Sequence, residues 1–460
     1  MIAYVLFRAV AGVALRWYYR DIHVEGIERI PRRGPVLLVV NHPNALVDAL
    51  LVLWVVPRRV LLTAKATLFG NRLLAAALRW FGVVPLHRAS DAAAAGSQPD
   101  PTRNRDSFRA VQAALRRGGT VLIFPEGRSH DEPSLAPLKT GAARMALSAW
   151  ETGGVAGLSV IPIGLTFERK DAPRTRVLVQ VGEPIRMESW EPRAGSRPAE
   201  ALTAEIDAKL RAVTLNHASS DAAARAARLA SAVAAVLGDV PAIGVVDRPL
   251  AADIEMARRI DRLAPRLARA DASLRARAED VVRRLDAIRR DAGAHGIRLE
   301  DARILLGSRH ALRFILREGW IVLVGGPVAL WGRLNHWLPF RAARALGRRS
   351  VESAADPAMR TLVAGAVLVL FAYLVQTTVV WRVWGPDIAL GYLVSLPIAA
   401  DINFSLSDRL RRAMRRAHAF VRFRRHPELH ARLAGELLAL RHDIVELDQA
   451  LSAPELAAGA

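Results

Sequence analysis

Short apolar runs alternate with segments of helical spacing through the first half of the chain. Val36 to Val40 is an unbroken run of branched side chains, which is typical of a buried parallel strand. Similar runs recur at Thr120 to Ile123, Val160 to Leu165 and Val177 to Val181. Because helical patterns lie between strand-like runs, the sequence predicts an α/β domain with a mixed, mostly parallel sheet over residues 21–215.

The second half of the chain is helical in pattern and then strongly apolar. Residues 216–317 have amphipathic helical spacing, which predicts helices packed through their apolar faces. Leu362 to Trp381 carries no charged residue and is long enough to cross a hydrocarbon layer of ~30 Å. With the shorter run at Trp384 to Ala400 it predicts a membrane hairpin inside a membrane region at 318–404. The alternative is a pair of buried helices in a soluble helical domain.

Three further segments flank these regions. Residues 1–20 mix apolar residues with arginines and end in aromatic residues, which predicts an amphipathic helix at the membrane interface. A helix docked on the α/β domain is an alternative that does not exclude the first. Trp320 to Gly332 contains a Gly-Gly-Pro interruption and is expected to be re-entrant or interfacial. Residues 405–460 are expected to form a basic helical tail.

Arginines lie on both sides of the predicted hairpin. Arg341, Arg344 and Arg348 precede it, and Arg409 and Arg411 follow it with further arginines. Since basic residues favour the cytoplasmic side of a membrane, both flanks and the α/β domain are expected on the cytoplasmic face of an integral membrane protein.

Composition narrows the class of partner. The chain has 460 residues, a net charge of +21 and no cysteine, which excludes disulfides, thiolate catalysis and cysteine-ligated zinc. The positive charge indicates an anionic partner. Because 52% of the residues are hydrophobic and no nucleic-acid motif is present, anionic membrane lipids are favoured over nucleic acid. Only four of the 65 basic residues are lysine, namely Lys65, Lys139, Lys170 and Lys209.

A histidine and a carboxylate follow the first buried run. His42 comes just after this strand, in a strand-to-helix loop where Pro43 suits a first helical position. Ala45 to Val56 is predicted to be an apolar helix, with Asp48 in its first turns. This spacing lets the carboxylate fix the tautomer of the imidazole and stabilise the imidazolium, so His42 is a candidate general base. The alternative is a capping histidine and a first-turn acid favoured by the helix dipole.

Candidate phosphate-binding residues follow two other runs. Arg88 ends one run, and Glu126, Gly127 and Arg128 follow the strand at 120–123. Arginine forks and the backbone N–H groups of such a turn can hold a phosphomonoester. Glu126 is expected to accept hydrogen bonds from hydroxyl groups or to orient an arginine. Lys139 is a second phosphate or CoA candidate, and for these cations the alternative is a solvated surface charge.

These motifs, in this order, resemble those of the phospholipid/glycerol acyltransferase family. They are Asn41 and His42 with Asp48, Gly82 with Arg88, the block from Phe124 to Ser129, and Pro162 in the fourth apolar run. Two features depart from the family pattern: five residues rather than four separate His42 and Asp48, and Ser129 comes one position early. The longer spacing is similar to a branch with fungal glycerol-3-phosphate and dihydroxyacetone-phosphate acyltransferases, which also carry long hydrophobic C-terminal extensions.

The resemblance implies an activity. It implies a membrane-bound O-acyltransferase of phospholipid biosynthesis that moves a fatty acyl group from acyl-CoA or acyl-carrier protein to glycerol-3-phosphate. The alternative acceptor is 1-acyl-sn-glycerol-3-phosphate (lysophosphatidate), and the alternative class is a non-enzymatic lipid-binding membrane protein. His42 and Asp48 are then the catalytic pair, no metal or redox cofactor is expected, and the acceptor is expected to be bound by Arg88, Glu126, Gly127, Arg128 and Lys139.

Overall fold

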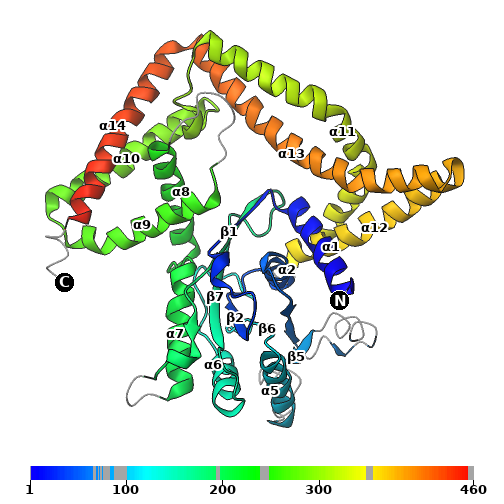
Figure 1. Cartoon of the computed structure of the whole chain (residues 1–460). Helices are drawn as coiled ribbons and strands as arrows, with labels where there is room; N and C mark the ends of the chain where they lie inside the picture. Colours follow the sequence, from blue (N-terminus) through cyan, green and yellow to red (C-terminus); the bar gives the residue numbers. More distant parts are fainter. Residues whose placement is uncertain are drawn as a thin grey trace. The chain divides into compact units, whose positions relative to one another are not determined.

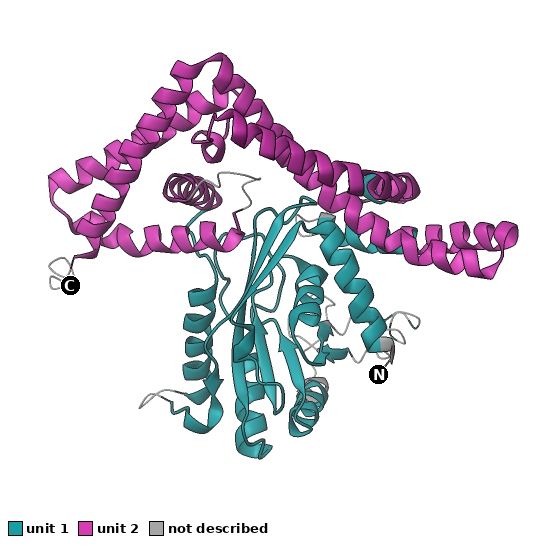
Figure 2. Cartoon of the chain, turned by 45° about the horizontal axis from the view of Figure 1, so that its top comes forward, with its two compact units in different colours: residues 1–219, 342–368 teal, residues 220–341, 369–460 magenta. Residues whose placement is uncertain are grey.

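The computed structural model describes residues 2–65, 69–70, 72, 75, 83–86, 101–192, 197–238, 248–348 and 356–453. These residues form two compact units, residues 1–219 with 342–368 and residues 220–341 with 369–460 (Figure 2). Each unit is described by itself.

The first unit contains a sheet flanked by helices (Figure 1). Its strands are β1 (Asp21–Glu25), β2 (Val36–Val40), β3 (Val60–Leu61), β4 (Thr63–Lys65), β5 (Val84–Leu86), β6 (Thr120–Ile123), β7 (Ser159–Phe167), β8 (Arg176–Val181) and β9 (Ile185–Arg186). Its α-helices are α1 (Ile2–Tyr18), α2 (Ala45–Val55), α5 (Pro101–Arg116), α6 (Gly141–Leu147) and α7 (Pro198–Val213). Short helical turns lie at Ile27–Arg29, Ser148–Thr152 and Met187–Ser189.

The main sheet is mixed and mostly parallel, which confirms the predicted fold class. Its strand order is β1-β8-β7-β2-β6-β3, with β9 paired to β7, while β4 and β5 form a separate pair. β2 lies parallel to both β6 and β7, and β8 and β9 lie antiparallel to β7. The carboxyl ends of β2, β6 and β7 therefore meet at one edge of the sheet, where α/β folds commonly place ligands.

Both faces of the sheet are covered, which explains the unbroken apolar runs. Alternate residues of β2 enter different cores: Leu38 and Val40 pack with α1 and α2, whereas Leu37 and Val39 pack with α5, α6 and α7. All five residues of β2 are fully buried. The central strand is thus fixed by apolar packing on both sides, so the loop that follows it starts from a rigid position.

Helix α1 packs on the first unit. Leu15 and Tyr19 are buried in the core that α1 and α2 share, and Gly12 has no room for a side chain because the Trp54 ring lies against it. On its other side Val5 and Leu6 are 61% and 62% exposed. The docked helix is therefore present, and a membrane contact of its exposed side stays a prediction.

The second unit is helical. Its helices are α8 (Ser220–Leu237), α9 (Leu250–Arg269), α10 (Ala272–Ala294), α13 (Pro386–Arg425) and α14 (Pro427–Ser452), together with most of α11 (Ser308–Arg348) and the end of α12 (Asp356–Trp384), plus a short turn at Leu299–Asp301. The tail predicted at 405–460 is helical, but it is not a solvated extension. Leu433, Leu437 and Leu440 of α14 are buried in one core with residues of α8 and α10. Pro427 starts α14 rather than interrupting a helix.

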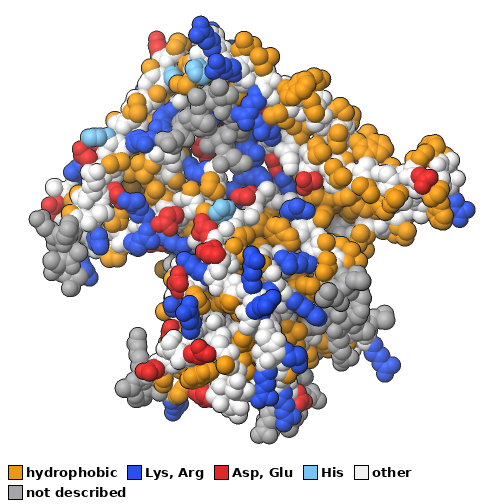
Figure 3. Space-filling view, viewed as in Figure 1, with side chains coloured by type: hydrophobic (Ala, Val, Ile, Leu, Met, Phe, Trp, Pro, Cys, Tyr) orange, Lys and Arg blue, Asp and Glu red, His pale blue; other side chains and the backbone are white. Residues whose placement is uncertain are grey.

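Three helices of the described chain are long and apolar enough to cross a membrane by length and composition. They are Ser308–Leu346, Ala358–Trp384 and Pro386–Arg425. The second and third cover the residues of the predicted hairpin, whose crossing of a membrane stays a prediction. Large apolar side chains on them, such as Phe371 and Leu390, are exposed. Figure 3 shows hydrophobic side chains gathered over α12 and α13. The segment expected to be re-entrant does not reverse, because α11 continues as one helix through Gly325-Gly326-Pro327.

Polar side chains join α11 to the hairpin. The Tyr392 hydroxyl donates to Asn335 Oδ1 at 2.6 Å, and His336 Nε2 lies 2.7 Å from the Tyr373 hydroxyl. Gly332 is pressed against the Ala399 carbonyl, so a side chain there would collide with α13. Small residues at a close crossing and interhelical hydrogen bonds are the interactions by which apolar helices associate in lipid.

We predict that Gly164→Ala destabilises the first unit, by about 1–3 kcal/mol as expected for overpacking. Gly164 lies in β7, and a Cβ there would collide with the Val213 carbonyl at the end of α7. Gly141→Ala is the matched control, because nothing lies within 4 Å of its Cβ position. The thermal midpoint of the purified full-length protein would be compared for both variants, and equal midpoints would contradict the close packing of α7 on β7.

Candidate active site

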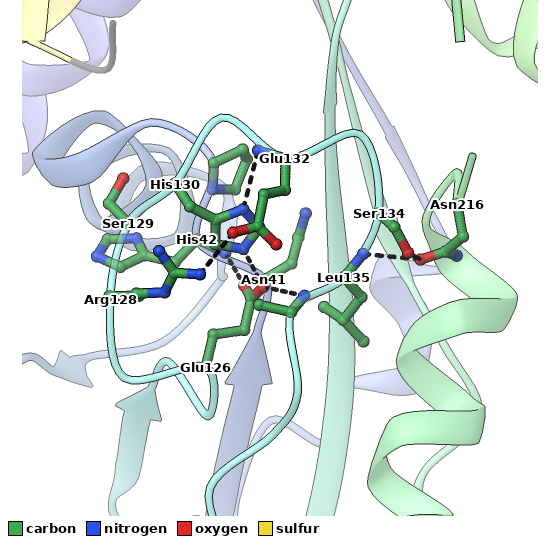
Figure 4. A network of polar contacts seen from close by, with 12 residues as sticks. Asn41, His42, Glu126, Arg128, Ser129, His130, Glu132, Ser134, Leu135 and Asn216 are labelled. Atoms are coloured by element: carbon green, nitrogen blue, oxygen red, sulfur yellow. Dashed lines mark hydrogen bonds and ion pairs between the residues drawn. The ribbon is translucent and has the colours of Figure 1, made fainter. Parts of the chain in front are cut away.

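Three loops meet at the carboxyl edge of the parallel strands. The first, called the His42 loop, is residues 41–44 between β2 and α2. The second, the Glu126 loop, is residues 124–140 after β6, and the third, the Lys170 loop, is residues 168–175 between β7 and β8. Figure 4 shows polar contacts that connect the first two loops.

The structure brings His42 and Asp48 together. His42 Nδ1 lies 2.9 Å from Asp48 Oδ2, and the Asn44 N–H donates to the same oxygen at 2.7 Å. Asp48 is fully buried, while the His42 side chain is 14% exposed. With the Nδ1 proton directed to the carboxylate, Nε2 is left as the proton acceptor. No hydrogen bond to Nε2 is found within the described part of the chain.

The ring of His42 is also fixed by stacking. It lies over Phe124 with the ring centroids 3.8 Å apart and the planes 12° from parallel. Phe124 directly follows β6, so the imidazole is held by a neighbour from the next parallel strand as well as by Asp48. Stacking and hydrogen bonding together restrict the ring to one orientation.

The environment of Asp48 opposes its charge. Burial raises the pKa of Asp48, and the hydrogen bonds from His42 and the Asn44 N–H, with the charge of Lys170, partly oppose that rise. Asp48 Oδ1 is buried and has no hydrogen-bond partner among the residues that the structure describes. The buried carboxylate therefore depends on these partners to keep its charge.

Glu126 lies at the centre of the loop contacts. Its Oε1 accepts the His42 N–H at 2.7 Å, and its Oε2 accepts the Ala136 N–H at 2.8 Å and a hydrogen bond from His130 Nε2. The Glu132 N–H donates to His130 Nδ1 at 3.2 Å, which fixes the neutral tautomer that donates through Nε2. Glu126 is buried and holds the loops together in this structure. Its role at an acceptor hydroxyl stays a prediction.

Gly127, Arg128 and Lys139 lie near one another on the Glu126 loop. Gly127 has a φ of +74° and its N–H donates to the Phe124 carbonyl at 3.1 Å, so the turn requires glycine and uses that amide internally. The Lys139 side chain lies against Gly127. Arg128 is 60% exposed and pairs with Glu132 at 2.5 Å. The two cations are accessible to an anion, and phosphate binding by them stays a prediction.

Arg88 lies outside the described residues, so its predicted place beside Arg128 is not described. The helix predicted at Ala45 to Val56 is confirmed as α2, but Pro43 lies in the loop before it and not at the first helical position. α2 begins at Ala45, because Asn44 has an extended φ of −142° and Ala45 has a left-handed φ of +47°. Neither residue has the φ of a right-handed helix, so regular helical dihedrals start only after Ala45.

The two departures from the family pattern meet in space. The Ala45 N–H, in the lengthened His42 loop, donates to Ser129 Oγ at 3.0 Å. Ser129 is the residue that comes one position early in the Glu126 loop. The sequence assigned Ser129 no role, and the structure shows that it accepts the amide at the strained start of α2.

Sequence reasoning missed other residues that hold the site. Asn41 pairs with the backbone of β7, accepting the Leu165 N–H at 2.7 Å and donating to the Leu165 carbonyl at 3.1 Å. The Tyr19 hydroxyl accepts from Asn44 Nδ2 at 3.1 Å. Lys170 reaches the His42 loop from the third loop. The signals in the sequence were the place of Asn41 in the first motif of the resemblance and the rarity of lysine in this chain, but the contacts themselves are long-range.

Comparisons with known proteins find similarity over the region that carries these loops. Residues 21–166 match the family described as Acyltransferase. The chain is 24% identical over 255 residues to an uncharacterized acyltransferase of Schizosaccharomyces pombe, which covers 38% of this chain and 38% of that protein. It is 43% identical over 82 residues to glycerol-3-phosphate O-acyltransferase 2 of Saccharomyces cerevisiae, 18% of this chain and 11% of that protein.

A plant relative and a solved structure match over longer stretches. The chain is 26% identical over 201 residues to the chloroplastic 1-acyl-sn-glycerol-3-phosphate acyltransferase LPAT1 of Arabidopsis thaliana, 44% of this chain and 51% of that protein. A solved 1-acyl-sn-glycerophosphate acyltransferase of Thermotoga maritima is 20% identical and covers 45% of this chain and 78% of that one, with a TM-score of 0.34. The fold is established by the strand order and not by this likeness.

The curated relatives are matched only in part, since the chain spans from 11% to 51% of the length of the three described above. The matched region includes the strands and the loops that carry His42, Asp48 and Glu126. Residues 21–166 of this chain are thus similar to the phospholipid/glycerol acyltransferase family.

Proposed function

We propose that this chain is a membrane-anchored O-acyltransferase that transfers a fatty acyl group from acyl-CoA or acyl-carrier protein to a hydroxyl of glycerol-3-phosphate. The observation that carries the proposal is the His42 imidazole, which is held by a buried carboxylate and keeps Nε2 available for a proton. A positioned base of this kind suits the activation of a hydroxyl.

The acceptor is chosen from two glycerophosphates. The spacing of His42 and Asp48 resembles the fungal branch, and a relative named as a glycerol-3-phosphate O-acyltransferase matches at 43% identity. Relatives named as 1-acyl-sn-glycerol-3-phosphate acyltransferases match over longer stretches at lower identity. Lysophosphatidate is therefore the second candidate acceptor. Both carry a phosphate that exposed cations such as Arg128 and Lys139 would attract.

The reaction follows from the orientation of the imidazole. His42 Nε2 takes the proton of the acceptor hydroxyl while its oxygen attacks the thioester carbonyl carbon. The C–S bond breaks, and the leaving thiolate takes the proton from the imidazolium. Asp48 keeps the imidazole in the correct tautomer and stabilises the imidazolium between these two steps. No redox change occurs, so the proposed reaction includes no redox cofactor.

The apolar helices supply the proposed location. We place α12 and α13 as a hairpin in the membrane, with the arginines in the second half of α13 and the acyltransferase domain on the cytoplasmic face. The net charge of +21 favours anionic lipids at that surface. An acyltransferase held at a membrane is close to its acylated products and lipid acceptors, which partition into the bilayer.

We expect His42→Ala to lower kcat by at least ~10²-fold, the usual contribution of a positioned base. Asp48→Asn should also be severely impaired, because it removes the charge that supports the imidazolium. The full-length protein in detergent would be given radiolabelled acyl donor with each acceptor in turn. His23→Ala is the matched control, since His23 lies in β1 outside the three loops. Undiminished turnover in His42→Ala would remove the base assignment.

The second prediction concerns the acceptor phosphate. Replacing Arg88 or Arg128 by lysine keeps the charge but loses the bidentate fork, so the acceptor KM should rise several-fold more than the donor KM. Saturation curves for both substrates would be measured in one detergent. Arg109→Lys on α5 is the control, because Arg109 is an exposed surface residue. A rise confined to the donor KM would assign these arginines to the CoA phosphates instead.

The third prediction concerns the membrane. The protein should stay in the pellet after carbonate or high-salt washing, because buried apolar helices are not screened by salt. Tags at the two ends of the chain should be digested from the same side of sealed vesicles if α12 and α13 alone cross. Tags on opposite sides would show that α11 crosses as well, and release by salt would contradict the hairpin.

A further inference from the structure

Lys170 is the cationic side chain that joins the loops of the site. It lies between β7 and β8, and its side chain is only 23% exposed. Its Nζ donates to the Pro43 carbonyl at 3.2 Å and to the His130 carbonyl at 3.4 Å, and it pairs with the Asp131 carboxylate. One ammonium group therefore reaches both the His42 loop and the Glu126 loop.

The backbone of the same residue adds a further connection. The Lys170 carbonyl accepts a hydrogen bond from Asn44 Nδ2 at 3.4 Å, and the Asn44 N–H donates to Asp48. The residues contacted by Lys170 thus flank His42 on one side and Glu126 on the other. Neither loop could shift against the other without breaking contacts to this lysine.

Lysine suits this place better than arginine. An ammonium group is compact and directs three N–H donors from one point, which matches two carbonyls and a carboxylate that converge. A guanidinium is planar and larger, and its donors form a fork. Because 61 of the 65 basic residues in this chain are arginine, a half-buried lysine here indicates a geometric requirement rather than composition.

The charge of Lys170 also acts on the catalytic pair. Lys170 and Asp48 attract one another electrostatically, and this attraction opposes the rise that burial causes in the pKa of Asp48. The other titratable or charged groups close to these two are Tyr19 of α1, His42 of its loop, Glu126, His130 and Asp131 of the Glu126 loop, and Asp171 beside Lys170.

We propose that Lys170 is a positioning residue for acyl transfer, which fixes the His42 loop against the Glu126 loop and supplies positive charge beside Asp48. This inference rests on the proposed function. Lys170 does not touch the reacting atoms and acts through His42 and Asp48. Its loss should therefore lower turnover and change the pH profile while leaving substrate affinity little affected.

The direction of the pH effect follows from the charge. Removing a cation makes protonation of the His42 and Asp48 pair more favourable, so the apparent pKa of the pair rises. The enzyme is active when the pair has released this proton. The active form is therefore lost as the pH falls through that pKa. The acid limb of the kcat profile should consequently move to higher pH when the cation is removed.

The test uses Lys170→Met, Lys170→Arg and the matched control Lys209→Met on α7, all in the full-length protein. We expect Lys170→Met to lower kcat by about 10- to 100-fold, as for a small misplacement of a base, with either KM changed less than about threefold. Its acid limb should move to higher pH. Lys170→Arg should return the acid limb towards the wild-type position while kcat stays reduced, and Lys209→Met should resemble wild type.

Several outcomes would overturn the inference. Wild-type kcat and pH profile in Lys170→Met would remove any positioning role, and a loss of kcat with an unmoved acid limb would show a merely structural one. The thermal midpoint shows whether Lys170→Met folds. If it does not fold, the Lys170→Arg variant tests the inference, because a wild-type kcat in that variant would contradict the requirement for a compact ammonium group. The His42→Ala variant distinguishes failure of this inference from failure of the proposed function. Its turnover tests whether His42 is the base, whatever the effect of replacing Lys170.

Discussion

The site depends on one electrostatic constraint, the burial of the Asp48 carboxylate at the edge of an apolar sheet. A fully buried carboxylate is costly unless hydrogen bonds and nearby positive charge compensate it. Here the compensation comes from His42, the Asn44 N–H and the charge of Lys170. Because a buried carboxylate interacts strongly with a nearby cation, the same feature that costs stability suits Asp48 to stabilise an imidazolium formed in the proposed reaction. The burial of Asp48 thus both lowers the stability of the fold and prepares the carboxylate for its proposed role.

The loops around this carboxylate are held by side chains that accept or donate to backbone groups. Glu126 accepts N–H groups from His42 and Ala136, Asn41 pairs with β7, and Lys170 donates to two carbonyls. Such contacts fix the backbone of the loops rather than the rotamer of any single side chain. They explain how three connections, which would otherwise be mobile, can keep a base in one orientation beside a rigid sheet.

The sequence predicted what depends on local pattern. The buried run at β2 and the polar residues after it indicated a strand end, and the spacing of His42 and Asp48 indicated their contact, which lies at 2.9 Å. The sequence could not show that Glu126 faces inward, because its partners are separated from it by up to 84 residues. The helix read from the sequence at Ala45 to Val56 is α2, whereas Pro43, a good first helical residue by propensity, lies before it because tertiary contacts fix the loop.

The departures from the family pattern show why spacing alone is a poor guide to such a pair. An extra residue between His42 and Asp48 would turn the carboxylate away if the helix began directly after the histidine. Instead Ala45 adopts a left-handed φ of +47°, a conformation that costs a non-glycine residue roughly 1–2 kcal/mol. Ser129 Oγ accepts the amide of this strained residue, and Ser129 is available there because the third block is one position shorter. The residues at the two departures are thus joined by a hydrogen bond beside the catalytic pair, and His42 and Asp48 are in contact at 2.9 Å in spite of the longer spacing.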